Sequence, residues 1–257
     1  MAELPKSQGV VDSSLAVAIS PRGVMRITIP LILFFVAMGV LCGLLLTLEP
    51  RIAVIRVLQL FHLDTDANLP TYFSAMLLLA SALALGSSAR LIRESEEPWF
   101  PWAALAVGFL LLSIDEVAMM HERVGMILKN LSPEVDSLGG FLNYKWVLVG
   151  IPVTVAVAFA FLPWFLTLRP RLKLLFAVSG TLFLGGAIGV EMINGYIADT
   201  RGTLSTAYVL VTAVEESLEM FGAALFLYAL LEDLQRRRAR LTFEVVDHSR
   251  KAALPIP

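Results

Sequence analysis

The sequence predicts an all-α fold: a polytopic integral membrane helix bundle of about six transmembrane helices, with both termini in the cytoplasm. Three observations predict it. The chain of 257 residues is 57% hydrophobic and only 16% charged, whereas a soluble domain carries roughly 25% charged residues. Six apolar runs are each long enough to cross roughly 30 Å of hydrocarbon as a helix. Lysine and arginine concentrate at alternate ends of these runs, which is typical of cytoplasmic loops.

The first span follows Arg22 and Arg26, as a signal peptide would, but its apolar run is too long and no small-residue cleavage site follows. We therefore expect an uncleaved anchor. The six spans are predicted at Ile27–Leu48, Thr71–Ala89, Pro101–Met120, Trp146–Leu166, Leu174–Tyr196 and Ala207–Leu231. The transmembrane domain is accordingly placed at 27–231, between a cytoplasmic tail at 1–26 and a basic cytoplasmic tail at 232–257.

The orientation follows from the basic residues. Of the 20 lysines and arginines, 14 lie on the side that holds both termini, which the positive-inside rule makes cytoplasmic. The other six are Arg51, Arg56, Arg123, Lys129, Lys145 and Arg201. The outer side then carries the loops 49–70, 121–145 and 197–206. The helical period of RIAVIRVLQLFHL in the first loop predicts a short interfacial helix, and residues 123–144 are expected to be irregular.

Acidic residues recur near the outer ends of the third, fifth and sixth spans, in SIDEVAMMHE, GVEMINGY and VEESLEMFG. With a rise of 1.5 Å per residue, these acids fall in one layer in the outer half of the bilayer. Within the sixth span, Glu215, Glu216 and Glu219 share one helix face. The acids inside predicted spans are Asp115, Glu116, Glu191, Glu215, Glu216 and Glu219.

The cost of burying these six carboxylates predicts that they face one another. At about 3 kcal/mol for a charge at the middle of a span, six would cost roughly 15–20 kcal/mol if they faced lipid. No lysine or arginine lies inside a predicted span to neutralise them. Three arrangements remain: protonated carboxyls, a water-filled cavity, or a bound cation. A divalent cation would relieve the mutual repulsion best.

We therefore predict a metal site formed by oxygen ligands, which favour Mn²⁺, Mg²⁺, Ca²⁺ or iron over Zn²⁺. The predicted ligands are Asp115, Glu122, Glu191, Glu215 and Glu219, and the predicted catalytic residues are His121, Glu116 and Glu216. In a regular helix His121 points about 120° away from Asp115. It joins the acids only if the helix unwinds near Met120.

The stretch LDTDANLPTYFS has the alternating start of a calcium loop, but leucine and alanine occupy its required glycine and glutamate positions. We interpret it as a helix start, with Asn68 capping the second span before Pro70 and Thr71. The segment lies on the outer side, close to the acid layer, and could add a ligand there.

LDTDANLPTYFS, SIDEVAMMHE and VEESLEMFGAALFLYALL together resemble an uncharacterised group of bacterial six-span integral membrane proteins. These stretches cover about 40 residues, some 15% of the chain. The resemblance implies a location in the bacterial inner membrane and brings no activity with it.

The leading functional hypothesis is a metal-dependent membrane enzyme that acts on a lipid or lipid-linked substrate. A cation- or proton-coupled transporter is an alternative, although no inverted repeat is evident and the inner halves of the spans lack polar residues. A structural or assembly subunit of a membrane complex is the third. Membrane lipids are the expected partners. Nucleic acid is not, because no basic stripe interleaved with aromatic residues occurs. The single cysteine, Cys42, excludes an intrachain disulfide and a cysteine zinc site.

Overall fold

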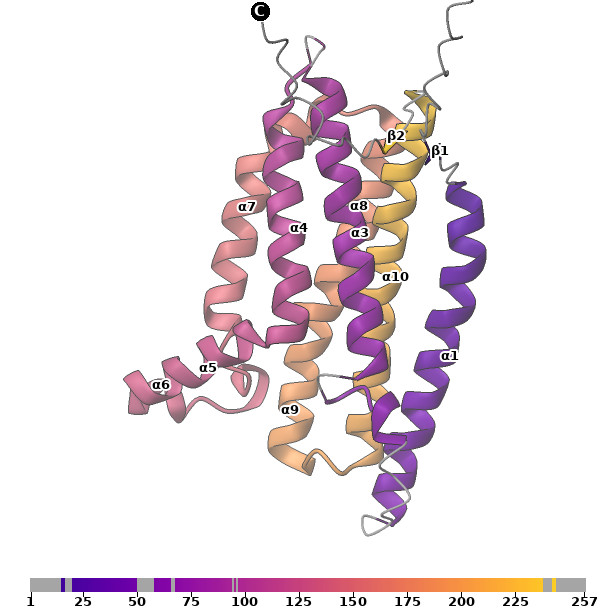
Figure 1. Ribbon diagram of the computed structural model, residues 1–257. Coiled ribbons are helices and arrows are strands. Elements are labelled where there is room, and N and C mark those ends of the chain that lie inside the picture. Colours follow the sequence, from indigo (N-terminus) through magenta and orange to yellow (C-terminus); the bar gives the residue numbers. More distant parts are fainter. Residues whose placement is uncertain are drawn as a thin grey trace, which may run out of the picture.

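The computed structural model describes residues 15–16, 20–49, 58–65, 68–93, 95, 97–237 and 242–243 (Figure 1). The regular secondary structure of these residues is helical apart from one short antiparallel pairing. The elements are β1 (Leu15–Ala16), α1 (Pro21–Leu48), η1 (Gln59–Phe61), α3 (Leu69–Ile92), α4 (Phe100–Ala118), α5 (Met120–Leu131), α6 (Pro133–Asp136), η2 (Gly140–Leu142), α7 (Val147–Thr167), α8 (Pro170–Leu184), η3 (Gly185–Val190), α9 (Glu191–Arg201), α10 (Thr206–Arg236) and β2 (Thr242–Phe243), which pairs with β1 in antiparallel register.

Five helical segments are long and apolar enough to cross a membrane: α1, α3, α4, α7 and the continuous run Pro170–Arg201. They correspond to the first five predicted spans. The sixth predicted span lies within α10, which has 31 residues and carries several acidic side chains. Large apolar side chains remain exposed along α1, α4 and α7. Exposed apolar surface on this scale is typical of helices that contact lipid.

The helix starts follow local capping rules. Ser20, Asn68 and Ser205 each accept a hydrogen bond from a backbone N–H in the first turn that follows. Asn68 Oδ1 lies 3.0 Å from the backbone N of Thr71, so the predicted cap of the second span is confirmed. Proline in the first turn of α1, α3, α4 and α8 removes a donor that has no helical partner at that position.

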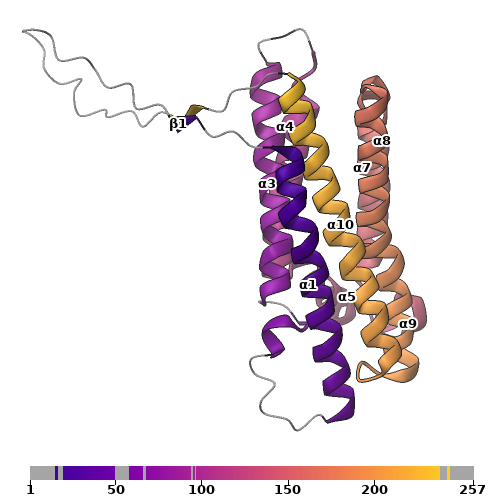
Figure 2. The same ribbon diagram turned by 90° about the vertical axis from the view of Figure 1, so that its right-hand side faces the viewer.

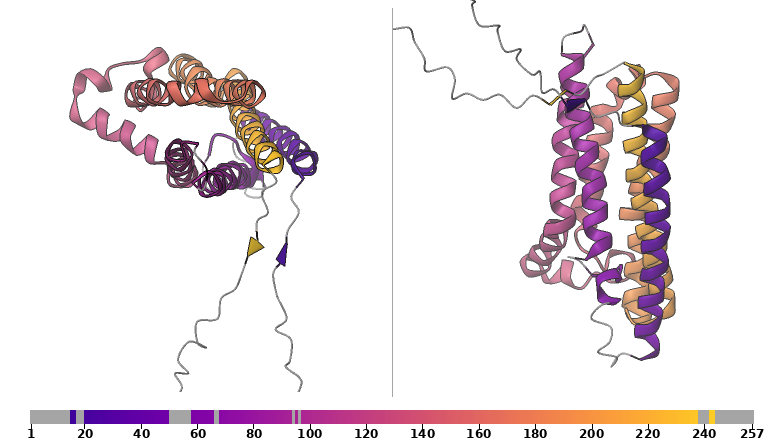
Figure 3. Two further views of the ribbon diagram at one scale, coloured as in Figure 1. Left: turned by 90° about the horizontal axis from the view of Figure 1, so that it is seen from above. Right: turned by 45° about the vertical axis from the view of Figure 1, so that its right-hand side comes forward.

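The helix α10 is the centre of the bundle, because it packs against α1, α3, α8, η3 and α9. Seen along the bundle, α3 and α4 form one layer and α7 and α8 the other, with α10 between them (Figure 3). The start of α1 and the end of α10 lie at the same end of the bundle (Figure 1). Figure 2 shows α8 and α9 following one another as one long rod.

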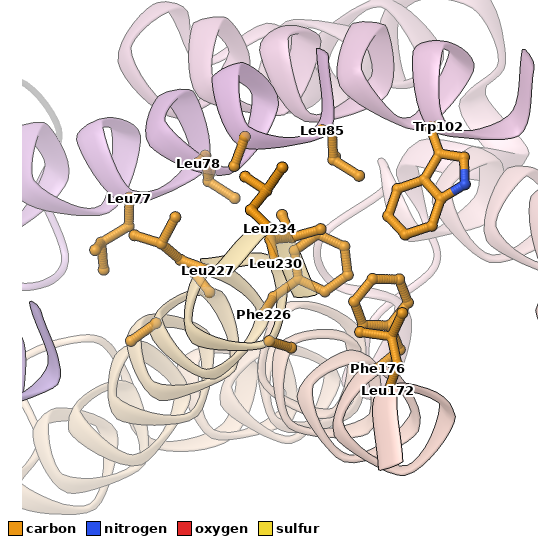
Figure 4. Close-up of a cluster of buried hydrophobic side chains, with 14 of the residues drawn as sticks. Leu77, Leu78, Leu85, Trp102, Leu172, Phe176, Phe226, Leu227, Leu230 and Leu234 are labelled. Atoms are coloured by element: carbon orange, nitrogen blue, oxygen red, sulfur yellow. The ribbon is translucent and has the colours of Figure 1, made fainter. Parts of the chain in front are cut away.

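A buried apolar core fills the end of the bundle where α1 starts and α10 ends. It joins α3, α4, α8 and α10 through side chains that include Leu85, Trp102, Phe176 and Leu230 (Figure 4). The rings of Phe109 and Phe226 stack with centroids 4.4 Å apart. This core fills one end of the bundle mainly with apolar side chains.

The same end carries a buried ion cluster. Asp233 on α10 is 1% exposed and accepts hydrogen bonds from Arg169, which caps α8, and from Arg237. Arg237 also binds both carboxylate oxygens of Glu97, which precedes α4. The cluster therefore ties the ends of three helices together.

Two outer connections differ from the expectation. Residues 123–144 contain α5 and α6 instead of being irregular, because Met120–Leu131 is rich in helix-forming residues and has Glu122 in its first turn and Lys129 in its last. In the connection 49–70, residues 50–57 lie outside the described residues, and so does most of the predicted interfacial helix. The described part of that stretch forms the short turn η1.

Candidate functional site: an acid-lined cavity

The third membrane-length helix breaks just after its acidic residues. Met119 takes a left-handed conformation, with φ 51° and ψ 43°, and separates α4 from α5. It is the non-glycine residue with positive φ in the described chain. The break brings His121 back to Asp115: the His121 backbone N lies 2.8 Å from Asp115 Oδ1, and its Nδ1 lies 2.9 Å from Asp115 Oδ2. The condition under which His121 joins the acids is therefore met.

The charge on Asp115 acts directly on His121. Burial disfavours the charged imidazole, but the hydrogen bond and negative charge of Asp115 outweigh it, so the pKa of His121 is raised. The more distant charges of Glu191 and Glu122 act in the same direction. The ring also meets the indole of Trp146 edge to face, with centroids 5.2 Å apart.

The fifth membrane-length helix is wound more loosely where it meets α10. Residues Gly185–Val190 form a π-helical segment, η3, between α8 and α9. A Cβ on Gly186 would lie 2.8 Å from the backbone O of Glu215 and 2.8 Å from Cγ of Glu219. Glycine is therefore what lets η3 approach the acidic stretch of α10.

Glu191 and Glu215, which lie near the contact between η3 and α10, both accept hydrogen bonds from neighbouring side chains. The Trp146 Nε1 donates to Glu191 Oε1 over 2.8 Å. The Nδ2 of Asn194 donates to Thr212 Oγ1 over 2.8 Å and to Glu215 Oε2 over 3.1 Å. Asn194 is 3% exposed, and its Oδ1 has no hydrogen-bond partner among the described residues.

A third group of polar residues comes from the loops. Tyr208 donates its hydroxyl hydrogen to Asp64 Oδ1, and the hydroxyl oxygens of Tyr144 and Tyr208 lie 2.9 Å apart. Burial raises the pKa of Asp64 and raises the pKa of Tyr144 to about 12. Tyr144 therefore stays protonated at neutral pH and available as a hydrogen-bond donor.

These groups surround a cavity of about 240 Å³ between α3, α4, α5, α7, η3, α9 and α10. All eight residues singled out from the sequence line it: Asp115, Glu116, His121, Glu122, Glu191, Glu215, Glu216 and Glu219. Asp64 also lines the cavity. The stretch LDTDANLPTYFS, which contains Asp64, therefore lies next to the acids, as its position in the sequence suggested. Neither lysine nor arginine occurs among the described lining residues of the cavity. The structure thus brings the predicted residues together, and their individual roles stay predictions.

The acids do not form a ready-made metal centre. Within the described ranges, no group of three or more His, Cys, Asp or Glu side chains is arranged to hold a metal ion. The geometry does not support metal binding by Asp115, Glu122, Glu191, Glu215 and Glu219 as a set. The physical reason is that the carboxylates spread around the cavity wall, and three of them are already engaged by His121, Trp146 and Asn194.

Sequence reasoning missed the polar and aromatic residues that hold the acids: Tyr144, Trp146, Asn194, Tyr208 and Thr212. A signal for some of them was present. Tyr208, Thr212, Glu215 and Glu219 follow one another at spacings of three and four residues, which places them on one face of α10. Asn194 stands three residues after Glu191, again on the same face. No such pattern marks Tyr144 and Trp146, which lie outside these helices.

Fold and cavity together define a helical bundle with membrane-length helices and an acid-lined cavity near one end. The chain belongs to the family described as Domain of unknown function (DUF8692), whose model matches residues 29–234. The match covers every acid of the cavity wall and agrees with the resemblance to an uncharacterised family. No protein of curated function and no solved structure matches the chain.

Proposed function

We propose that the protein is an enzyme of the bacterial inner membrane, with six spans and cytoplasmic termini, that acts on a lipid or lipid-linked substrate in the acid-lined cavity. The Asp115–His121 pair carries this proposal. Asp115 accepts from Nδ1 and leaves Nε2 as the nitrogen that can exchange a proton with a substrate. A carboxylate that orients a histidine in this way is a recurring acid–base arrangement.

The acids give the cavity a second role, which is to bind positive charge. Eight carboxyl groups line it without a lysine or arginine, so it attracts cations and repels anions. A divalent cation fits the proposal as an ion completed by oxygen atoms of the substrate, because the described acids form no ligand set on their own. Such an ion would neutralise charge on the substrate during the reaction.

The test is lipid conversion by protein reconstituted into vesicles of total bacterial lipid, followed by mass spectrometry of the lipids. The wild-type protein is expected to convert a lipid species, and His121→Gln is expected to lower the rate by about 100-fold or more, as loss of a general acid–base does. Glu134→Gln, an exposed acid outside the cavity, should keep the wild-type rate. Conversion that is absent in wild type, or unchanged in His121→Gln, would refute the proposal.

One observation favours the alternative of a cation- or proton-coupled transporter. Two membrane-length segments are irregular beside the cavity, at Met119 and at Gly185–Val190, and interrupted helices are frequent at transport sites. The apolar core across the other end of the bundle counts against a path through it. Ion flux in proteoliposomes that Glu219→Gln abolishes, with no lipid conversion, would establish the transporter instead.

A further inference from the structure

We propose that the substrate is a lipid whose headgroup carries a positively charged amine, and that this headgroup enters the cavity sideways from the bilayer, between α4 and α7. The inference rests on the proposed function in one respect: it takes the acid-lined cavity as the functional site. It adds the chemical class of the ligand and the route by which it arrives.

The route runs between α4 and α7, which are not among the closely packed helix pairs of the described bundle. At one end the rings of Trp102 on α4 and Trp164 on α7 meet edge to face at 5.2 Å. At the other end His121 on α5 meets Trp146, the residue before α7, at 5.2 Å. Between these contacts α4 packs mainly against α3, and α7 approaches mainly η3, so α4 and α7 do not form a packed pair.

Both helices carry apolar side chains that the bundle leaves uncovered. On α4, Leu111 is exposed, and on α7 Val153 and Val157 are exposed. Both helices bury very little of their surface inside the bundle. In a membrane such a gap is filled by acyl chains, because hydrocarbon is the only solvent there that suits leucine, isoleucine and valine side chains.

The gap is continuous with the acid-lined cavity. Leu112 on α4 and Thr154 on α7 both line the cavity, and Leu112 is also exposed at the surface of α4. A lipid lying between the two helices would therefore place its headgroup against the acids while its chains stay in the bilayer. A wholly water-soluble substrate would make no use of this apolar flank.

The negative charge of the cavity wall favours a lipid headgroup that carries an amine. The cavity wall supplies carboxylates but no lysine or arginine, so a phosphate or sulfate group without a compensating amine would be repelled. The buried Oδ1 of Asn194 points to the same conclusion, since a buried acceptor without a partner is costly and an ammonium donor would satisfy it.

An organic ammonium group also fits better than a bare metal ion. No group of three or more His, Cys, Asp or Glu among the described residues is arranged to hold a metal ion, whereas an ammonium group can donate its three hydrogens to a mixture of carboxylates and neutral acceptors such as Asn194 Oδ1. A cavity of about 240 Å³ has room for a small aminoalkyl headgroup. The class of ligand is thus a lipid with a compact amine headgroup.

The experiment measures binding of two lipids with identical chains, phosphatidylethanolamine and phosphatidylglycerol, to the full-length protein by native mass spectrometry. They share the phosphate and differ in the amine. The wild-type protein is expected to bind the ethanolamine lipid about tenfold more tightly, the usual worth of a charge-assisted hydrogen bond. Glu215→Gln and Glu219→Gln should each remove most of that preference, while Glu134→Gln should keep it. Equal binding of the two lipids by the wild-type protein would overturn the proposal.

The route is tested with bulky substitutions in the wall of the gap. Leu111→Trp from α4 and Val153→Trp from α7, at exposed residues that are not among those lining the cavity, should each weaken binding of the ethanolamine lipid about tenfold or more and leave binding of ethylamine, a soluble amine, unchanged. Leu83→Trp on the exposed surface of α3 is the matched control and should bind as wild type does. The melting temperature of each variant shows whether it is still folded. If both variants melt as the wild type does and still bind the ethanolamine lipid normally, the lateral route is wrong.

The two proposals fail in different ways. His121→Gln should keep the preference for the amine lipid and lose lipid conversion. Amine-selective binding without conversion by the wild-type protein would refute the enzyme and support the ligand class. Conversion of a lipid that lacks an amine would support the enzyme and refute the ligand class.

Discussion

At the scale of single residues, Asp115 and His121 have the clearest division of roles. Asp115 holds both the backbone N and the Nδ1 of His121, so one carboxylate caps α5 and orients the ring. The pair exists because Met119 adopts a left-handed conformation, which costs a non-glycine residue roughly 1–2 kcal/mol. Strain of this kind is common at functional sites.

The raised pKa of His121 leads to a prediction about Asp115→Asn. Removing the carboxylate charge while burial persists should lower the pKa of His121, because the remaining environment disfavours the charged ring. NMR titration of the histidine side chains measures this shift. Glu134→Gln, at an exposed residue that is not among the groups that shift the pKa of His121, should leave the titration unchanged. A pKa that stays constant in Asp115→Asn would contradict the pairing.

Stability should depend on pH through the same residue. Because the folded-state pKa of His121 is raised, its stabilising effect is complete below the unfolded pKa of about 6.5 and is lost as pH rises through the folded pKa. Wild type should therefore melt above His121→Gln at about pH 6, and the difference should shrink toward about pH 9. Melting curves across this range provide the measurement, and a difference that widens with pH would contradict the sign.

At the scale of elements, the approach of η3 to α10 depends on Gly186. Gly186→Ala places a methyl group against Glu215 O and Glu219 Cγ, so we expect destabilisation of about 1–3 kcal/mol, typical of overpacking. Gly180 is the matched control because its Cβ position meets nothing within 4 Å. Gly180→Ala should be neutral or stabilising by up to about 1 kcal/mol through helix propensity. Thermal unfolding compares them, and equal effects would show that η3 and α10 are less closely packed.

The ion cluster at the other end of the bundle gives a second prediction about elements. Asp233→Asn removes the buried charge shared by Arg169 and Arg237, and breaking a buried pair costs about 3–5 kcal/mol. Glu232→Gln, one residue away, removes an exposed pair with Arg171 and should cost about 1 kcal/mol or less. Denaturant unfolding distinguishes the two, and similar losses would mean that Asp233 is not a buried anchor.

The sequence predicts the positions of the helices better than it predicts the arrangement of the site. Helix positions were predictable because apolar run length and the Asn68 cap are local features, and the shared face of Glu215 and Glu219 follows from helical spacing. The break at Met119 was not predictable, since methionine has no preference for that backbone conformation. The aromatic donors to the acids, such as Trp146, are set by how loops fold back over the bundle, which no periodicity reports.

At the scale of the whole molecule, the predicted topology puts the acid-lined cavity near the outer surface and the ion cluster near the cytoplasm. A cysteine introduced at Glu134 should react with a membrane-impermeant maleimide in intact cells, and one at Glu97 should react only after lysis. The native thiol is a suitable background because Cys42 is buried. The reverse labelling pattern would invert the orientation.

The π-helical turn at Gly185–Val190 has a consequence for how this cavity could change over time. A turn of this kind accommodates one residue more than an ordinary helix. Deleting a single glycine there should let the helix return to regular winding, because the extra residue is absorbed within the turn and the helix beyond it keeps its orientation. Loss of one codon would thus reshape the approach of Gly186 to α10 and leave Glu191 and Asn194 facing the cavity.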